Sequence, residues 1–127
     1  MFKTILLIKK RPDLTRAQFA DYYDNHHLPF MLDLLPGKVA LHRRNYIVDG
    51  SDFEYRGKDV ANRWPGDFDV ITEAIYNTRE EAEQLTALCR DPDIYRRIVA
   101  DEANFIELGG VKKYIVDVRE TQIKPLS

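Results

Sequence analysis

The chain has 127 residues, 44% of them hydrophobic and 31% charged, and its 19 Lys and Arg against 21 Asp and Glu give a formal net charge of −2. This length suffices for one compact domain and excludes two domains with separate cores. The charge balance excludes the strongly basic surface typical of nucleic-acid-binding proteins. The longest apolar run, residues 5–8, is far shorter than the roughly 20 residues that span a bilayer.

The start of the chain and its cysteine content indicate the cellular compartment. Lys9, Lys10 and Arg11 interrupt any apolar segment near the start, so no signal peptide is expected. The single cysteine, Cys89, cannot form an internal disulfide and has no neighbours with the spacing of a metal site. We therefore expect a cytoplasmic protein that binds neither nucleic acid nor a membrane.

The predicted elements begin with a strand at residues 2–8, which is rich in leucine and β-branched residues on both faces. Thr15 and Gln18 have the spacing of a capping box, which predicts a helix from Thr15. At about 100° per residue, four side chains share the apolar stripe of this helix: Phe19, Tyr23, His26 and Phe30. Pro29 predicts that the helix kinks or ends near residues 26–28.

The rest of the chain alternates strands and helices. In order, the pattern predicts a strand at 38–48, a long loop at 49–67, a strand at 68–76, helices at 78–89 and 91–106, and a strand at 111–118. Gly109 and Gly110 are expected to end the second of these helices. Residues 1–119 then form one domain, and residues 120–127 form a short polar tail.

The order strand, helix, strand, strand, helix, strand is the split βαβ arrangement of ferredoxin-like folds, which are α+β with a four-stranded antiparallel sheet. Helices on one face of such a sheet leave the other face bare. The first and last strands are nevertheless apolar on both faces. A second copy of the same sheet is the simplest cover, so we expect a homodimer.

Two phenols and two imidazoles lie within residues 22–27. A spacing of four residues places Tyr22 beside His26 and Tyr23 beside His27, so each phenol could hydrogen-bond an imidazole and form a proton relay. In the alternative interpretation His26 is a core histidine and His27 a helix-end residue whose cationic form suits the helix dipole. Adjacent histidines point about 100° apart, which argues against a shared metal ion.

Acidic residues also occur where apolar ones are expected. Glu102 lies within the apolar stripe of the last predicted helix and Asp101 flanks that stripe. A buried carboxylate must be paired, protonated or functional. Glu73 shares a face of its strand with apolar residues. In the alternative interpretation, this face is exposed to solvent at the margin of the sheet.

The strand at 38–48 carries basic residues on both faces. Arg43 shares one face with Asn45, and Arg44 shares the other with His42. Either arginine could hold a carboxylate or phenolate substrate, or form an ion pair across a dimer. Trp64, in the long loop, is either a lid over an aromatic ligand or an anchor for the loop.

Four segments together resemble the EthD family over nearly the whole chain. They are Ile5 to Pro12, Phe19-x-x-Tyr22-Tyr23-x-x-x-His27-x-Pro29, Phe68 to Glu73, and Ala100-Asp101-Glu102-x-x-Phe105. The resemblance implies a ferredoxin-like dimeric α/β barrel. It also singles out His27, two residues before the proline, rather than His26.

The resemblance implies a cofactor-free enzyme that moves protons on a cyclic or aromatic, polyketide-like or catabolic substrate. Decarboxylation, dehydration, isomerisation and cyclisation all fit. Our hypothesis makes His27 the acid or base, oriented by Tyr23 and tuned by Glu102 or Asp101. The expected substrate contacts are His26, Tyr22, Phe19, Arg44, Trp64 and Glu73. A non-catalytic accessory protein that binds a hydrophobic ligand, or a cofactor-free monooxygenase, are the alternatives.

Overall fold

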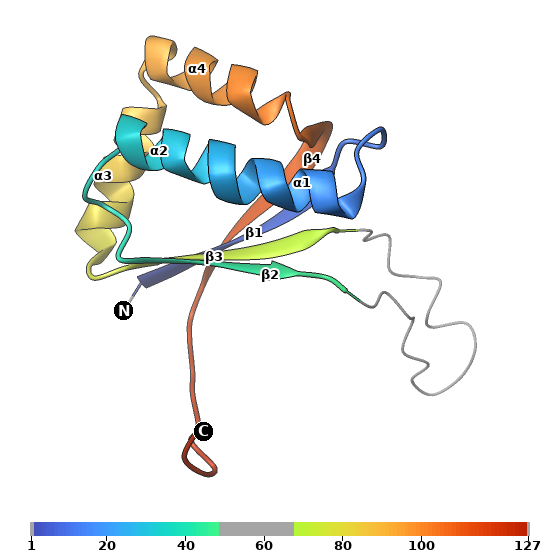
Figure 1. Ribbon diagram of the computed structural model, residues 1–127. Helices are drawn as coiled ribbons and strands as arrows, with labels where there is room; N and C mark the ends of the chain where they lie inside the picture. Colours follow the sequence, from blue (N-terminus) through green and yellow to red (C-terminus); the bar gives the residue numbers. More distant parts are fainter. Residues whose placement is uncertain (1, 49–67, 127) are drawn as a thin grey trace.

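The computed structural model describes residues 2–48 and 68–126. Its elements are β1 (Phe2–Lys10), α1 (Arg16–Tyr22), the π-helical turn η1 (Tyr23–His27), α2 (Leu28–Leu34), β2 (Leu41–Tyr46), β3 (Val70–Tyr76), α3 (Arg79–Cys89), α4 (Pro92–Glu102) and β4 (Ile106–Val116). The strands form one antiparallel sheet in the order β2-β3-β1-β4 (Figure 1). This confirms the predicted α+β, ferredoxin-like fold with four antiparallel strands.

The first helical region is continuous from α1 through η1 to α2. Its capping box is present: the Thr15 hydroxyl accepts from the Gln18 backbone N–H at 3.1 Å, and the Gln18 side chain accepts from the Thr15 N–H at 2.9 Å. Pro29 does not end the helix, because a π turn precedes it, in which the Leu28 N–H bonds the Tyr23 carbonyl five residues back. The wider turn accommodates a residue that lacks an N–H and that crowds a regular α-helix.

The prediction for the end of the last helix is wrong. α4 ends at Glu102 and β4 begins at Ile106, so Gly109 and Gly110 lie within a strand instead of closing a helix. Phe105 and Ile106 are buried, and a short apolar run does not by itself distinguish a helix from a strand. The pairing of β1 with β4 shifts register between Ile8 and Lys10, next to these glycines.

Other boundaries also differ. β2 and β3 are shorter than the predicted 38–48 and 68–76, while β4 is longer than the predicted 111–118. α3 follows Thr78, whose hydroxyl accepts from the Glu81 N–H at 3.2 Å, as the sequence indicates. The predicted loop at 49–67, with Trp64, lies outside the described residues.

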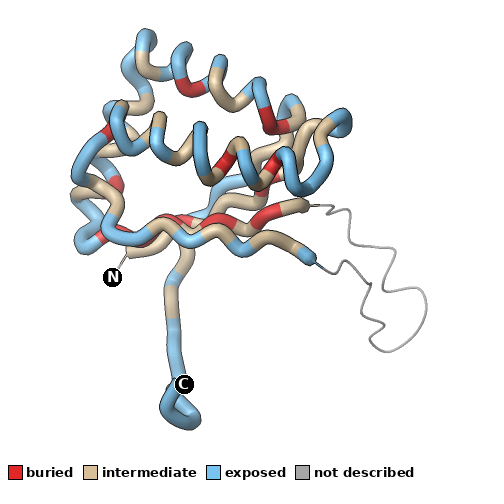
Figure 2. Tube along the Cα trace, in the orientation of Figure 1, coloured by how far each residue is buried: buried red, intermediate tan, exposed pale blue. Residues whose placement is uncertain are grey.

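All the described helices cover one face of the sheet, and the segment after β4 extends away from the opposite face (Figure 1). The core lies between the two layers, where Figure 2 shows buried positions along the helices and the sheet. Its main cluster consists of Ile8, Phe19, Tyr23, Val70, Phe105 and Ile106. Within residues 2–48 and 68–126 no helix has both the length and the apolar character needed to cross a membrane.

Candidate active site

A cavity of about 190 Å³ lies between the helices and the sheet. Its walls are mainly apolar side chains: Leu6, Ile8, Leu28, Met31, Leu32, Leu35, Val39, Ala74, Leu85, Ile98, Ile106 and Val111. The other lining residues carry polar or ionisable groups: Thr4, Tyr23, His27, His42, Tyr76, Cys89, Glu102 and Lys113. An engineered cavity of about 150 Å³ binds benzene, so this cavity has room for a single-ring molecule.

His27 borders the cavity and is held by a carboxylate. Its Nδ1 lies 2.6 Å from Oδ2 of Asp101 on α4. The other oxygen of Asp101 accepts a hydrogen bond from the Tyr22 hydroxyl at 2.8 Å. An ionised carboxylate only accepts hydrogen bonds, so Nδ1 carries the proton and the lone pair of His27 is on Nε2. His27 is therefore arranged to accept a proton.

Two effects act on the pKa of His27. Burial of the ring lowers this pKa, and the hydrogen bond and charge of Asp101 raise it. Burial is the larger effect, so the pKa lies below the ordinary value of a histidine. The imidazole is consequently neutral near pH 7, which a general base requires.

The π turn explains which histidine reaches the cavity. At 100° per residue His26 falls on the apolar stripe, but η1 contains wider turns and changes the direction of the side chains that follow. His26 is exposed and stacks on Tyr22 with ring centroids 5.1 Å apart. The expectation that His26 lies on the buried stripe is wrong, and His27 borders the cavity in its place.

Neither phenol hydrogen-bonds a histidine in the way the four-residue spacing predicts. The Tyr23 hydroxyl lies 2.8 Å from that of Thr72 on β3, and its ring meets His27 edge-on, with centroids 5.6 Å apart. Burial raises the pKa of Tyr23 to about 12. Tyr23 thus shapes the wall of the cavity, and Asp101 is the residue that orients His27.

Glu102 lies on α4 next to Asp101 and borders the cavity. Burial raises the pKa of Glu102, and the neighbouring charge of Asp101 raises it further. Among the described residues it forms no side-chain hydrogen bond or ion pair. The sequence allowed Glu102 to be paired, protonated or functional. The structure gives no support for pairing.

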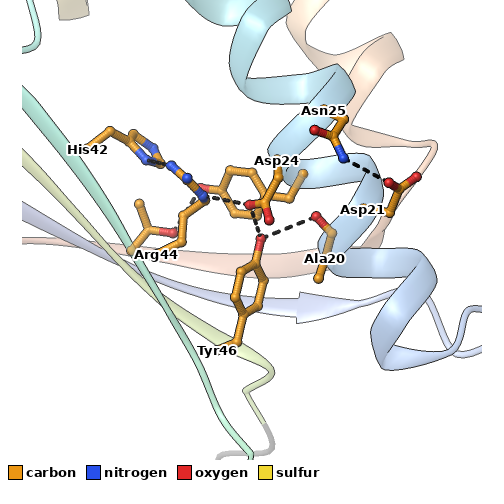
Figure 3. A network of polar contacts seen from close by, with 9 residues as sticks. Ala20, Asp21, Asp24, Asn25, His42, Arg44 and Tyr46 are labelled. Carbon is orange, nitrogen blue, oxygen red and sulfur yellow. Dashed lines mark hydrogen bonds and ion pairs between the residues drawn. The ribbon is translucent and has the colours of Figure 1, made fainter.

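A second polar network approaches the cavity from β2, and sequence reasoning did not select its key residue, His42. Arg44 Nη1 lies 2.9 Å from His42 Nδ1, and Arg44 Nε lies 2.7 Å from Asp24 Oδ1. The Tyr46 hydroxyl donates to the same Asp24 oxygen at 2.6 Å (Figure 3). The available signal was its spacing: His42 is two residues before Arg44 and so shares its face of the strand.

The remaining predicted contacts lie away from the cavity. Phe19 is in the core at 1% exposure, Tyr22 bonds Asp101 outside the cavity wall, and Arg44 lies behind His42.

Glu73 is on the opposite face of the sheet, where Lys3 at 2.7 Å, together with Asn45 and Arg43, lowers its pKa to about 2. Trp64 lies outside the described residues. The structure thus brings together His27, Asp101, Tyr23 and Glu102, with Tyr22 behind them.

A metal site has no support in the part of the chain that the structure describes. No cluster of three or more His, Cys, Asp or Glu side chains there is arranged to hold a metal ion. What the arrangement offers is a neutral imidazole with a free acceptor nitrogen and a carboxyl group with a raised pKa, both at one apolar cavity. These groups can move protons.

Solved structures with the same fold cover most of the chain. An EthD-like protein from Ralstonia eutropha JMP134 is similar with a TM-score of 0.61 and 17% identity over 96% of each chain. A mutant form of SnoaB, a cofactor-independent oxygenase from Streptomyces nogalater, has a TM-score of 0.52 and 12% identity over 97% of each chain. A dimeric ferredoxin-like protein from Thermobifida fusca YX has a TM-score of 0.53 and 13% identity over 92% of this chain and 90% of its own.

Comparison with functionally curated proteins gives no match. At these identities the solved structures show a shared fold and not a shared reaction. The EthD domain model matches residues 11–109, which is well over half of the chain and includes both η1 and α4. On that match, this protein belongs to the EthD family.

Proposed function

We propose that this protein is a cofactor-independent enzyme that moves protons on a small cyclic or aromatic molecule. The reaction would be of the lyase, isomerase or cyclase type, such as a decarboxylation or a dehydration. The observation that carries the proposal is the position of His27, which is bound at Nδ1 by Asp101 and borders an apolar cavity. A buried base oriented by a carboxylate is the usual arrangement for general base catalysis.

In this reaction His27 Nε2 takes a proton from the bound molecule. The imidazolium that forms lies beside Asp101, whose charge stabilises it. Glu102 borders the same cavity, and its raised pKa favours a protonated carboxyl group that can return a proton to the product. Tyr22 and Asn104 act behind Asp101, since Asn104 Nδ2 donates to the Tyr22 hydroxyl at 2.9 Å.

The cavity supports a small apolar substrate. Leucine, isoleucine, valine and methionine side chains make most of its walls, and its volume of about 190 Å³ suits one ring with short substituents. A few polar groups in an apolar cavity commonly orient a ligand and determine specificity.

We further propose that two copies of the chain pack through their sheets. β1 directs Ile5 and Leu7 to the face opposite the helices, and β3 directs Ile71 to the same face. Among the described residues no helix lies over this face of the sheet (Figure 1). The Thermobifida fusca protein with this fold is described as dimeric, which supports a dimer here.

The test of the function is a comparison of two variants. His27→Gln removes the base, and His26→Gln makes the same change at the exposed neighbour. With aromatic and cyclic carbonyl compounds screened for turnover, His27→Gln should lower kcat/KM at least about 100-fold, the usual effect of losing a general base. His26→Gln should retain activity, and circular dichroism should show both variants folded.

Three outcomes contradict the proposal. Full activity of His27→Gln shows that His27 is not the base. Ligand binding without turnover, unchanged in His27→Gln, indicates an accessory binding protein. Oxygen consumption with an electron-rich phenol indicates a monooxygenase. SnoaB, which has the same fold, is described as a cofactor-independent oxygenase.

A further inference from the structure

The tautomer of His42 follows from its partner. A guanidinium group has only donors and remains charged at any accessible pH, so Arg44 Nη1 donates to His42 Nδ1 across 2.9 Å. His42 Nδ1 is therefore the acceptor, and the ring proton is on Nε2. This is the opposite of His27, where Asp101 accepts at Nδ1 and the lone pair is on Nε2.

The network around Arg44 holds this arrangement in place. Asp24 accepts from Arg44 Nε at 2.7 Å and from the Tyr46 hydroxyl at 2.6 Å (Figure 3). Asp24 therefore holds the guanidinium group in place while its Nη1 contacts His42. Asp24 and His27 both belong to the π turn η1. One short segment thus carries His27 and, through Asp24 and Arg44, also positions His42.

The two rings border the same cavity and contact the same tyrosine. Their centroids lie 5.6 Å (His27) and 5.8 Å (His42) from that of Tyr23, both in edge-on geometry. Burial, followed by the positive charge of Arg44, lowers the pKa of His42 to about 4. His42 is therefore neutral at physiological pH and offers one N–H donor rather than a positive charge.

We infer that the cavity takes a carbonyl compound with a hydrogen on the carbon next to the carbonyl group, with His27 as the base and His42 Nε2–H as the donor to the carbonyl oxygen. This inference rests on the proposed function and adds to it the substrate class, a second catalytic residue and a positioning residue, Arg44. The catalytic pair consists of two histidines whose partners fix opposite tautomers.

The step balances without any other reactant. His27 Nε2 takes the proton from the carbon, the electron pair of that C–H bond forms the new carbon–carbon double bond, and the carbonyl π pair moves onto oxygen. The product of this step is an enolate. The hydrogen bond from His42 Nε2–H to the enolate oxygen strengthens, while the proton remains on His42. A neutral imidazole that polarises a carbonyl group is an established catalytic arrangement.

The first experiment measures the tautomers directly. Long-range ¹H–¹⁵N spectra of the full-length protein at pH 7 should show His42 with its proton on Nε2 and His27 with its proton on Nδ1. Arg44→Met should change the tautomer balance of His42 and leave that of His27. Arg43→Met, which removes the neighbouring arginine on the other face, should change neither. A wild-type His42 protonated on Nδ1, or an unchanged His42 in Arg44→Met, would overturn the inference.

The second experiment uses acetophenone and cyclohexanone as probes. Proton NMR in D₂O follows the exchange of their α-hydrogens for deuterium, a reaction that needs only enolisation. Wild-type protein should accelerate this exchange. His27→Gln and His42→Phe should each reduce the acceleration at least tenfold, and His42→Gln, which keeps a side-chain N–H, should restore part of it.

The outcomes separate this inference from the proposed function. If His27→Gln abolishes exchange and His42→Phe does not, His27 is the base and the role of His42 is wrong. If His27→Gln has no effect, the proposed function itself fails. If the wild-type protein accelerates the exchange of neither ketone while both tautomers are as expected, the carbonyl class is wrong.

Discussion

At His27 the burial of the ring and the charge of Asp101 act on the pKa in opposite directions, and burial has the larger effect. The carboxylate therefore has two roles: it fixes the tautomer and it limits the fall of the pKa. A base with a pKa far below the working pH is too weak to take a proton, so the balance between these two effects matters for the chemistry.

Asp101→Asn should lower the pKa of His27 further, because the raising effect of the carboxylate is lost while burial remains. An NMR titration of the His27 ring protons measures this pKa. Tyr22→Phe is the matched control, since it removes a hydrogen bond to Asp101 and keeps the charge. A His27 pKa in Asp101→Asn that is equal to or above the wild-type value would contradict this interpretation.

The lowered pKa of His42 predicts how stability depends on pH. The unfolded chain takes up the His42 proton near pH 6.5, whereas the folded protein takes it up only near pH 4. The free energy of unfolding should therefore fall as the pH decreases through this window, by up to about 2 kcal/mol for a ring that water still partly reaches. Urea denaturation at pH 7 and pH 4.5 measures the change.

His42→Phe is the control for this prediction, because phenylalanine fills similar space and does not titrate. The variant should lose less stability than the wild type over the same window. Glu102 acts in the opposite direction, since its raised pKa adds stability as the pH falls. Glu73, with a pKa near 2, lowers stability progressively as the pH falls below about 5.5, and it does so equally in both proteins. An equal pH dependence in wild type and His42→Phe would show that His42 is not responsible.

At the scale of elements, the π turn η1 decides which side chains reach the cavity. A regular helical wheel assumes 100° per residue and therefore selects His26. Pro29 marks the irregularity in the sequence, but a proline predicts only a disturbance and not its form. The contacts of Asp24 with Arg44 and of His27 with Asp101 join this turn to β2 and α4.

The register shift between β1 and β4 lies next to a glycine that the packing requires. A Cβ atom at Gly110 would lie 2.8 Å from the Glu107 carbonyl oxygen and 3.1 Å from that of Lys9, and both are backbone atoms that cannot easily move. Gly110→Ala should therefore lower the free energy of unfolding by about 1–3 kcal/mol, as overpacking does. Urea denaturation measures this.

Gly109→Ala is the comparison within the same segment. Gly109 has a φ of +74° and nothing within 4 Å of its added Cβ, so only the backbone conformation opposes the change. The expected loss is roughly 1 kcal/mol. If Gly110→Ala costs no more than Gly109→Ala, the close backbone contact is not what requires glycine there.

At the scale of the whole molecule, the described helices cover one face of the sheet and leave the other face without a helix (Figure 1). Ile5, Leu7 and Ile71 lie on this second face beside the ion pair of Lys3 with Glu73. Interfaces between folded subunits commonly have an apolar centre and a polar rim, and the dimer proposed above would bury these apolar side chains.

Leu7→Lys should convert the proposed dimer to a monomer, because a charge would be buried between the two sheets without a partner. Light scattering over a range of concentrations measures the mass. Val99→Lys places the same charge on the outer surface of α4, where the side chain is 44% exposed, and should leave the mass unchanged. A wild-type mass of one chain at all concentrations would rule out the dimer.

Much of the fold could be predicted from the sequence because its signals are local. The capping residues Thr15 and Thr78 mark two helix starts, and the alternation on β2 separates Arg43 from Arg44. The end of α4 could not be predicted, since Phe105 and Ile106 continue the apolar period into a strand. The candidate site followed the same division: His27 and Asp101 were selected, and His42 was not.

By itself the sequence determined the order of elements, the antiparallel sheet and the segment that carries the candidate base, because these depend on periodicity, capping residues and short motifs. Only the tertiary structure decided that Asp101 rather than Tyr23 orients His27, and that Arg44 fixes His42 at the same cavity. These contacts join residues 74 positions apart in one case and depend on the π turn in both. No local pattern encodes the contact of His27 with Asp101, since it exists only after α4 packs against η1. The spacing of His42 and Arg44 is local, but the hold of Asp24 on Arg44 exists only after β2 packs against η1.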